Sequence, residues 1–193
     1  MQINVQVFYD YFGFLFTGVW LTLALTVVSV CIGIVMGLFL SLGKLSTIKP
    51  VKTFTAIYID VIRGTPLLAQ IFQYVPNVIL DAIISLAINC SAYIAEIFRG
   101  GIQSIERGQG EAALSLGMTP GQSMRYVVLP QAVRRVLPPL GNVFISMLKD
   151  SSMVSVISMQ ELLFKGMIAA GQSFRPFEIW IMVAALYLML TLP

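Results

Sequence analysis

The chain has 193 residues, of which 58% are hydrophobic and 11% are charged, and its mean hydropathy is +0.87. Soluble domains carry charge on about 25% of their residues, so this composition excludes an ordinary soluble protein and indicates an integral membrane protein. There is no His, and the two cysteines, Cys31 and Cys90, lie in apolar sequence, so we expect neither a metal site nor a disulfide framework. The formal charge of +3 is small, which makes its placement more informative than its size.

Five apolar segments predict an all-α, polytopic membrane protein: residues 14–42, 54–80, 82–98, 136–157 and 177–192. A membrane-spanning helix needs about 20 apolar residues, and the first segment has no charge at all. It is too long for a signal-peptide core and no Lys or Arg precedes it, so we expect it in the mature protein. Gly64-Thr65-Pro66 and then Pro76 break the second segment, and Lys149-Asp150-Ser151-Ser152 interrupts the fourth.

The cations are distributed unevenly between the connectors. The first and third connectors contain Lys44, Lys49, Lys52, Arg99, Arg107, Arg125, Arg134 and Arg135. The opposite-side connectors contain only Lys165 and Arg175. Because basic loops stay in the cytoplasm, this bias predicts an external N-terminus and cytoplasmic connectors at residues 44–52 and 99–135.

A helix-turn-helix is expected inside the long cytoplasmic connector. Gly108 and Gly110 predict an interruption of the preceding helix, so that a new helix starts at Glu111. It continues through Ala112, Ala113 and Leu114 and closes with Gly117 as its C′ glycine. Thr119 and Pro120 predict the N-cap and first position of a second helix, with Met124, Val127, Val128 and Leu129 on its apolar side. The first helix suits a groove on a partner; the alternative is an amphipathic segment on the membrane surface.

The pattern Glu111-Ala112-Ala113, then Gly117, then Leu129-Pro130 resembles the cytoplasmic coupling loop of ATP-binding-cassette (ABC) importer permeases. The segments that begin Tyr58-Ile-Asp-Val-Ile-Arg-Gly-Thr-Pro, Asn89-Cys-Ser-Ala-Tyr-Ile-Ala-Glu and Lys149-Asp-Ser-Ser are similar to permeases of the polar amino acid subfamily. This resemblance implies a type I importer permease fold and a homo- or heterodimer of permease subunits. It also implies two ATPase subunits in the cytoplasm, which bind ATP and Mg²⁺, and an extracytoplasmic amino-acid-binding protein.

Two features depart from the family pattern. The connector between Gln73 and Ala82 is short, and the last apolar segment stops at Pro193 without a basic tail. We therefore expect one permease domain over residues 1–193, with a coupling loop at about 100–135 and an incomplete C-terminus.

Polar residues inside the spans are candidates for substrate contacts, because charge in a membrane is costly. Arg63 could bind an α-carboxylate, helped by a half-helix that starts at Pro66 with Thr65 as its cap; alternatively, it pairs with a carboxylate such as Asp60. At the interruption formed by Lys149, Asp150, Ser151 and Ser152, Asp150 could bind the α-ammonium group or a cationic side chain of the substrate, and the two serines could form hydrogen bonds nearby. Alternatively, Lys149 forms a structural ion pair with Asp60 or Glu96. Asn89 and Ser91 could contact substrate or join helices. For Glu96 we favour a salt bridge with Arg99.

The sequence contains no nucleotide site, because residues 37–45 have five residues between the glycines where a P-loop has four, and Leu45 where it has Ser or Thr. We therefore expect no enzymatic activity and no cofactor in this chain. The expected function is a membrane-embedded subunit of an ATP-driven importer for polar amino acids, with basic amino acids or glutamine preferred, in a prokaryotic inner membrane and without a nucleic-acid partner. The alternative is a facilitator or channel that works without ATP.

Overall fold

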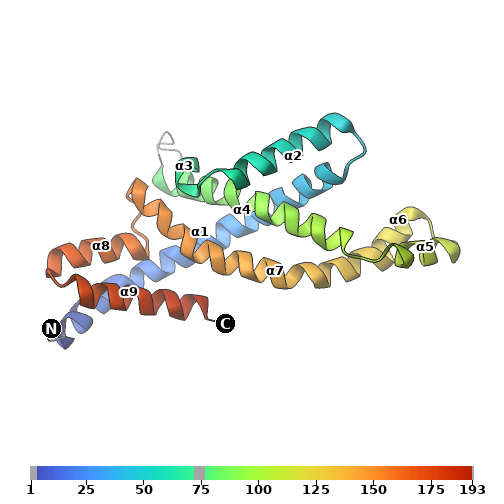
Figure 1. Ribbon diagram of the computed structural model, residues 1–193. Coiled ribbons are helices and arrows are strands. Elements are labelled where there is room, and N and C mark those ends of the chain that lie inside the picture. Colours follow the sequence, from blue (N-terminus) through green and yellow to red (C-terminus); the bar gives the residue numbers. More distant parts are fainter. Residues whose placement is uncertain (1–3, 72–76, 193) are drawn as a thin grey trace. The chain divides into compact units, whose positions relative to one another are not determined.

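The computed structural model describes residues 4–71 and 77–192, and within them the chain is almost entirely helical (Figure 1). The elements in chain order are α1 (Val5–Leu45), α2 (Lys49–Gly64), α3 (Leu67–Gln70), α4 (Val78–Gln103), α5 (Arg107–Ser115), α6 (Pro120–Ser123), the π-helix η1 (Met124–Val128), α7 (Leu129–Asp150), the 3₁₀-helix η2 (Ser151–Ile157), α8 (Leu162–Ser173) and α9 (Pro176–Thr191). The all-α expectation is confirmed.

Each of the five expected apolar segments corresponds to a helix or to a pair of helices. Residues 14–42 fall in α1, 82–98 in α4 and 177–192 largely in α9, while 54–80 is divided between α2, α3 and α4 and 136–157 between α7 and η2. Among the described residues, α1 and α4 are each long and apolar enough to cross a membrane. A bent pair, Pro120–Ile157 with Leu162–Ser173, forms a third candidate span with an angle of 56°. Helix α8 was not expected, because its 12 residues are shorter than a span.

The helices form two compact units. Unit 1 comprises Met1–Cys31, Thr65–Ala87 and Phe144–Pro193, and unit 2 comprises Ile32–Gly64 and Ile88–Val143. The long helices α1, α4 and α7 each contribute one part to unit 1 and one part to unit 2.

In unit 1, the first half of α1 packs with α8 and α9, and α8 and α9 run side by side (Figure 1). Their buried core includes Leu15 of α1, Leu162 of α8 and Ile179 of α9. The helices approach closely at Gly166, where an added Cβ would lie 2.7 Å from Cγ2 of Val183. Glycine is therefore required for the contact between α8 and α9.

In unit 2, glycines bring four helices into close contact. A Cβ on Gly37 would lie 2.8 Å from Cγ2 of Ile94, which places α1 against α4, and one on Gly43 would lie 2.6 Å from Cγ2 of Thr55 on α2. On Gly101, a Cβ would lie only 2.2 Å from Cγ2 of Val136 on α7. The second half of α1, together with α2, the end of α4 and the start of α7, thus forms a tightly packed group.

Candidate functional site

The hairpin formed by α5 and α6 occupies the expected helix-turn-helix position in unit 2 (Figure 1). Its first helix begins at Arg107 and not at Glu111, so the expected start is wrong. Gly108 and Gly110 lie inside α5, since a helix tolerates glycine at a cost of about 1 kcal/mol per residue relative to alanine. Glu111 lies in the middle of this helix and is exposed.

The end of α5 has the expected glycine closure. Gly117 has a φ of 85°, in the left-handed region that glycine adopts without steric cost. Its amide donates to the carbonyl of Leu114 (2.9 Å), and the amide of Met118 donates to the carbonyl of Ala113 (3.2 Å). These two bonds form a Schellman motif, so the prediction of Gly117 as the C′ residue is confirmed.

The second helix of the hairpin starts with a complete capping box. The Thr119 hydroxyl accepts a hydrogen bond from the Gln122 amide, the Gln122 side chain accepts one from the Thr119 amide at 2.8 Å, and Pro120 follows the cap. The predicted start at Thr119 and Pro120 is therefore confirmed. The expected apolar side is not buried within the chain, since η1 contains no buried residue and both Met124 and Leu129 are exposed.

Side-chain contacts join the two helices of the hairpin to each other and join α7 to the connector that precedes α5. The Ser123 hydroxyl donates to the carbonyl of Gly110 at 3.5 Å, and the Arg135 guanidinium donates to the carbonyl of Ser104. Ala113 is buried beneath this arrangement, whereas Ala112 and Leu114 are exposed and Leu116 is 82% exposed. The first helix of the hairpin, closed at its C-terminus, therefore presents two leucines and the carboxylate of Glu111 to its surroundings.

Three of the candidate substrate residues lie in unit 2. Arg63 is in the last turn of α2, with its guanidinium carbon 5.5 Å from the centroid of the Tyr93 ring, a cation–π contact between α2 and α4. Ser91 is fully buried; its hydroxyl donates to the carbonyl of Ile88 at 2.7 Å and lies 3.1 Å from the Tyr58 hydroxyl. Asn89 is also buried on α4. The contacts of Ser91 fit the helix-joining alternative.

The other five substrate candidates lie in unit 1, at two breaks between helices. Thr65 does not cap a half-helix: its hydroxyl accepts from Nε2 of Gln70 at 2.8 Å, and α3 starts at Leu67 with Pro66 in the N-cap position. The expected cap at Thr65 is therefore wrong, because Pro66 occupies the N-cap position and no side chain caps α3. The second break is confirmed: α7 ends at Asp150 and a 3₁₀-helix follows.

Unit 1 brings these two breaks together, because α3 contacts η2. At the second break, the buried Ser151 hydroxyl donates to the carbonyl of Leu148 at 2.8 Å. Asp150 and Ser152 are half-buried and Lys149 is exposed. The carboxylates suggested as ion-pair partners of Lys149 both bind Lys44 instead, with Nζ 3.9 Å from Asp60 and 2.5 Å from Glu96. The expected pair between Glu96 and Arg99 is present at 2.7 Å.

Glu161 is a buried polar residue that sequence reasoning missed. It is fully buried at the N-cap of α8, where its carboxyl group accepts from the amides of Leu163 (2.9 Å) and Phe164 (2.8 Å). It also accepts from the Tyr187 hydroxyl at 2.9 Å and from Thr22 at 3.5 Å. The sequence feature that could have identified Glu161 as a helix N-cap is its position directly before the apolar run of α8. The cluster joins α1, α8 and α9.

These features define a polytopic helical membrane protein with a helical hairpin between α4 and α7. The family model of the binding-protein-dependent transport system inner membrane component matches residues 29–193, and the chain belongs to this family.

Individual relatives agree with this assignment. The chain is 35% identical to the probable glutamine ABC transporter permease protein GlnM of Bacillus subtilis (strain 168), over 98% of this chain and 92% of the relative. It is 37% identical to the glutamine transport system permease protein GlnP of Escherichia coli (strain K12), over 100% of this chain and 93% of the relative. A solved structure described as an amino acid ABC transporter with histidines has a TM-score of 0.94 and 44% identity, over 99% of this chain and 94% of that chain.

Proposed function

We propose that this chain is the permease subunit of an ATP-driven importer for polar amino acids. The observation that best supports the coupling role is the α5–α6 hairpin, because its first helix is closed at its C-terminus by a Schellman motif and exposes Leu114 and Leu116. Such a helix fits a groove on a partner better than it fits an isolated surface. The family assignment and the relatives named above support the same function.

The proposed topology places the N-terminus outside and the hairpin in the cytoplasm. This orientation rests on the cations at the end of α1, at the start of α2 and near the end of α4, since Lys44, Lys49, Lys52 and Arg99 would then lie on the cytoplasmic side with the hairpin. An ATPase dimer could reach the hairpin there, and ATP and Mg²⁺ would be bound by that dimer.

The substrate class follows from the relatives. Two of them carry glutamine in their names and the solved structure is described as containing histidines, so glutamine and basic amino acids are the preferred candidates for this chain. In unit 1, Thr65, Lys149, Asp150, Ser151 and Ser152 remain candidate contacts, and in unit 2 Arg63, Asn89 and Ser91 do. A second permease subunit, identical or related, would complete the path, and an external binding protein would deliver the amino acid.

Replacing Leu116 with Asp tests the coupling role of the hairpin. The complex of this chain with its ATPase would be reconstituted in lipid vesicles with the binding protein, and ATP hydrolysis would be measured with glutamine, arginine, lysine and histidine. We expect one amino acid to stimulate the wild-type complex and Leu116→Asp to abolish that stimulation, because a charge replaces an exposed apolar contact. Glu111→Lys should weaken it as well, and Lys52→Glu, an exposed charge reversal on α2, serves as the control.

The second candidate function is a facilitator that does not use ATP. Amino-acid flux that follows only a concentration gradient, together with no stable complex with an ATPase, would favour it and overturn the importer.

A further inference from the structure

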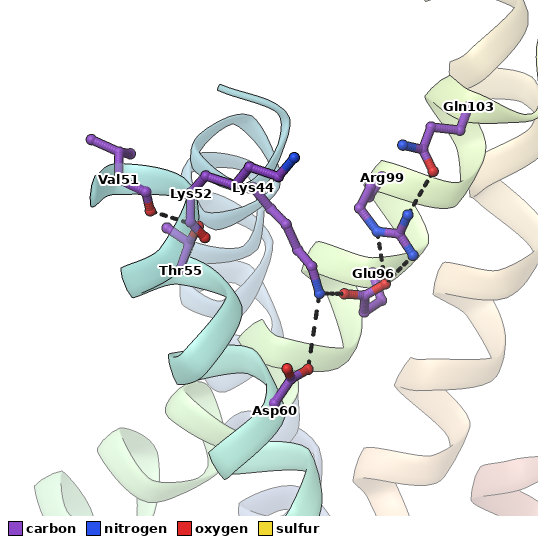
Figure 2. Close-up of polar contacts among 8 residues, drawn as sticks. All are labelled: Lys44, Val51, Lys52, Thr55, Asp60, Glu96, Arg99 and Gln103. Atoms are coloured by element: carbon purple, nitrogen blue, oxygen red, sulfur yellow. Dashed lines mark hydrogen bonds and ion pairs between the residues drawn. The ribbon is translucent and has the colours of Figure 1, made fainter. Parts of the chain in front are cut away.

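A network of charged side chains connects three helices of unit 2 (Figure 2). Lys44, in the last turn of α1, donates a hydrogen bond from Nζ to Oε1 of Glu96 on α4 at 2.5 Å. The same ammonium group lies 3.9 Å from Oδ1 of Asp60 on α2. The side chains of Lys44 and Glu96 are only 20% and 16% exposed, so water screens this pair weakly.

The network continues along α4 toward the hairpin. Arg99 donates from both Nε (2.9 Å) and a terminal nitrogen (2.7 Å) to Oε2 of Glu96. Its other terminal nitrogen donates to Oε1 of Gln103 at 2.6 Å (Figure 2). Glu96, Arg99 and Gln103 are spaced three and four residues apart, so they lie along one face of the helix. Gln103 is the last residue of α4, and α5 starts four residues later at Arg107.

The Lys44–Glu96 bond adds a directional link between helices that glycine contacts already pack closely. The contacts of Gly37 with α4 and of Gly43 with α2 are close, but they are apolar and act over short distances. The Lys44–Glu96 bond is directional, and it joins α1 to the part of α4 that leads into the hairpin. Pulling on α5 would therefore move the ends of α1 and α4 together.

We propose that Lys44 and Glu96 are positioning residues for energy coupling, which transmit movement of the α5 helix to the membrane-embedded part of unit 2. This inference rests on the proposed function, in which α5 receives that movement from an ATPase. Without the bond, the end of α1 follows the movement of the hairpin and of α4 less closely. ATP hydrolysis then continues, but fewer amino acid molecules are transported per ATP.

The test compares Lys44→Met with Lys52→Met in vesicles that contain the chain, its ATPase and its binding protein. Both substitutions remove one ammonium group and keep most of the aliphatic stem, but Lys52 of α2 is exposed and has no ion pair among the described residues. Uptake of radiolabelled glutamine and arginine and release of phosphate are measured on the same vesicles. We expect Lys44→Met to lower uptake per ATP about tenfold, within the usual range for coupling between sites, and Lys52→Met to leave it unchanged.

A charge exchange separates positioning from general damage. Glu96→Lys alone places three cations together and should uncouple transport, whereas the double variant Lys44→Glu/Glu96→Lys restores a bond between α1 and α4 and should recover uptake per ATP at least in part. The inference is overturned if Lys44→Met matches Lys52→Met, or if uptake and hydrolysis fall in equal proportion. Wild-type vesicles without ATP-dependent uptake would overturn the proposed function, and this inference with it.

Discussion

At the scale of single residues, one buried polar cluster, centred on Glu161, is held together by hydrogen bonds between helices. The fully buried Glu161 carboxyl group receives hydrogen bonds from two backbone amides and two hydroxyls. Thr22 extends this cluster, because its hydroxyl also accepts from the amide of Leu162 at 3.2 Å. A buried polar group that loses its partner is costly, so this cluster should make a large contribution to the stability of unit 1.

Replacing Tyr187 with Phe tests this contribution. The substitution keeps the ring and removes only the hydroxyl that donates to Glu161. We expect it to lower the free energy of unfolding by about 1–3 kcal/mol, measured by unfolding of the purified protein in detergent micelles. Tyr9→Phe is the matched control, because Tyr9 is 79% exposed. Equal stabilities of the two variants would contradict a structural role for the cluster.

At the scale of elements, glycine has opposite effects inside α5 and just after its C-terminus. Gly117 is required by its positive φ at the C-terminus, whereas Gly110 has ordinary helical geometry, and a Cβ there would lie 3.9 Å from the Ser123 hydroxyl oxygen. The sequence predicts the first role correctly, because a glycine after the last helical residue is a local signal. It fails at Gly108 and Gly110, since glycine inside a helix and glycine that ends a helix look alike without the tertiary contacts.

Alanine substitutions at these two glycines should therefore change the stability of α5 in opposite directions. Gly117→Ala forces a side chain into the left-handed region, at a cost of about 1–2 kcal/mol. Gly110→Ala should stabilise the helix by about 0.5–1 kcal/mol. Hydrogen exchange at the backbone amides of positions 117 and 118 should become faster in the Gly117→Ala variant and slower in the Gly110→Ala variant. A change in the same direction in both variants would contradict the assignment of Gly110 to the helix interior.

At the scale of the whole molecule, each unit contains helices whose contact depends on a glycine. In unit 2 this is Gly101 of α4 against Val136 of α7, and in unit 1 it is Gly166 of α8 against Val183 of α9. The adjacent Gly100, in the same helix as Gly101, differs because a Cβ added there would meet no neighbouring atom within 4 Å. A side chain at Gly100 therefore enters open space.

Gly101→Ala should destabilise the protein by about 1–3 kcal/mol, because the added methyl group overlaps Cγ2 of Val136. Gly100→Ala is the matched control and should be neutral or slightly stabilising. The double variant Gly101→Ala/Val136→Ala removes the overlap and should recover part of the loss. The stability of all three variants is measured as the midpoint of thermal unfolding in detergent. A Gly101→Ala protein as stable as the Gly100→Ala protein would contradict the close contact between Gly101 and Val136.

The sequence by itself determined the features that depend on local chemistry. These are the apolar helices, the break at Gly64-Thr65-Pro66, the end of α7 at Asp150, the closure of α5 by Gly117, the N-cap at Thr119 and the salt bridge between Glu96 and Arg99. Each follows from residues within a few positions of one another, or from a family pattern that is visible along the chain.

Only the tertiary structure decided which distant residues meet. It paired Lys44 with Glu96 across 52 positions, placed Glu161 beside Tyr187 and turned the hydroxyl of Thr65 toward Gln70 and not toward a helix N-terminus. It also revealed α8, which is too short to be recognised as a span by its apolar length. The physical reason is that hydrogen bonds and ion pairs between helices depend on rotation and register, which composition and spacing do not fix.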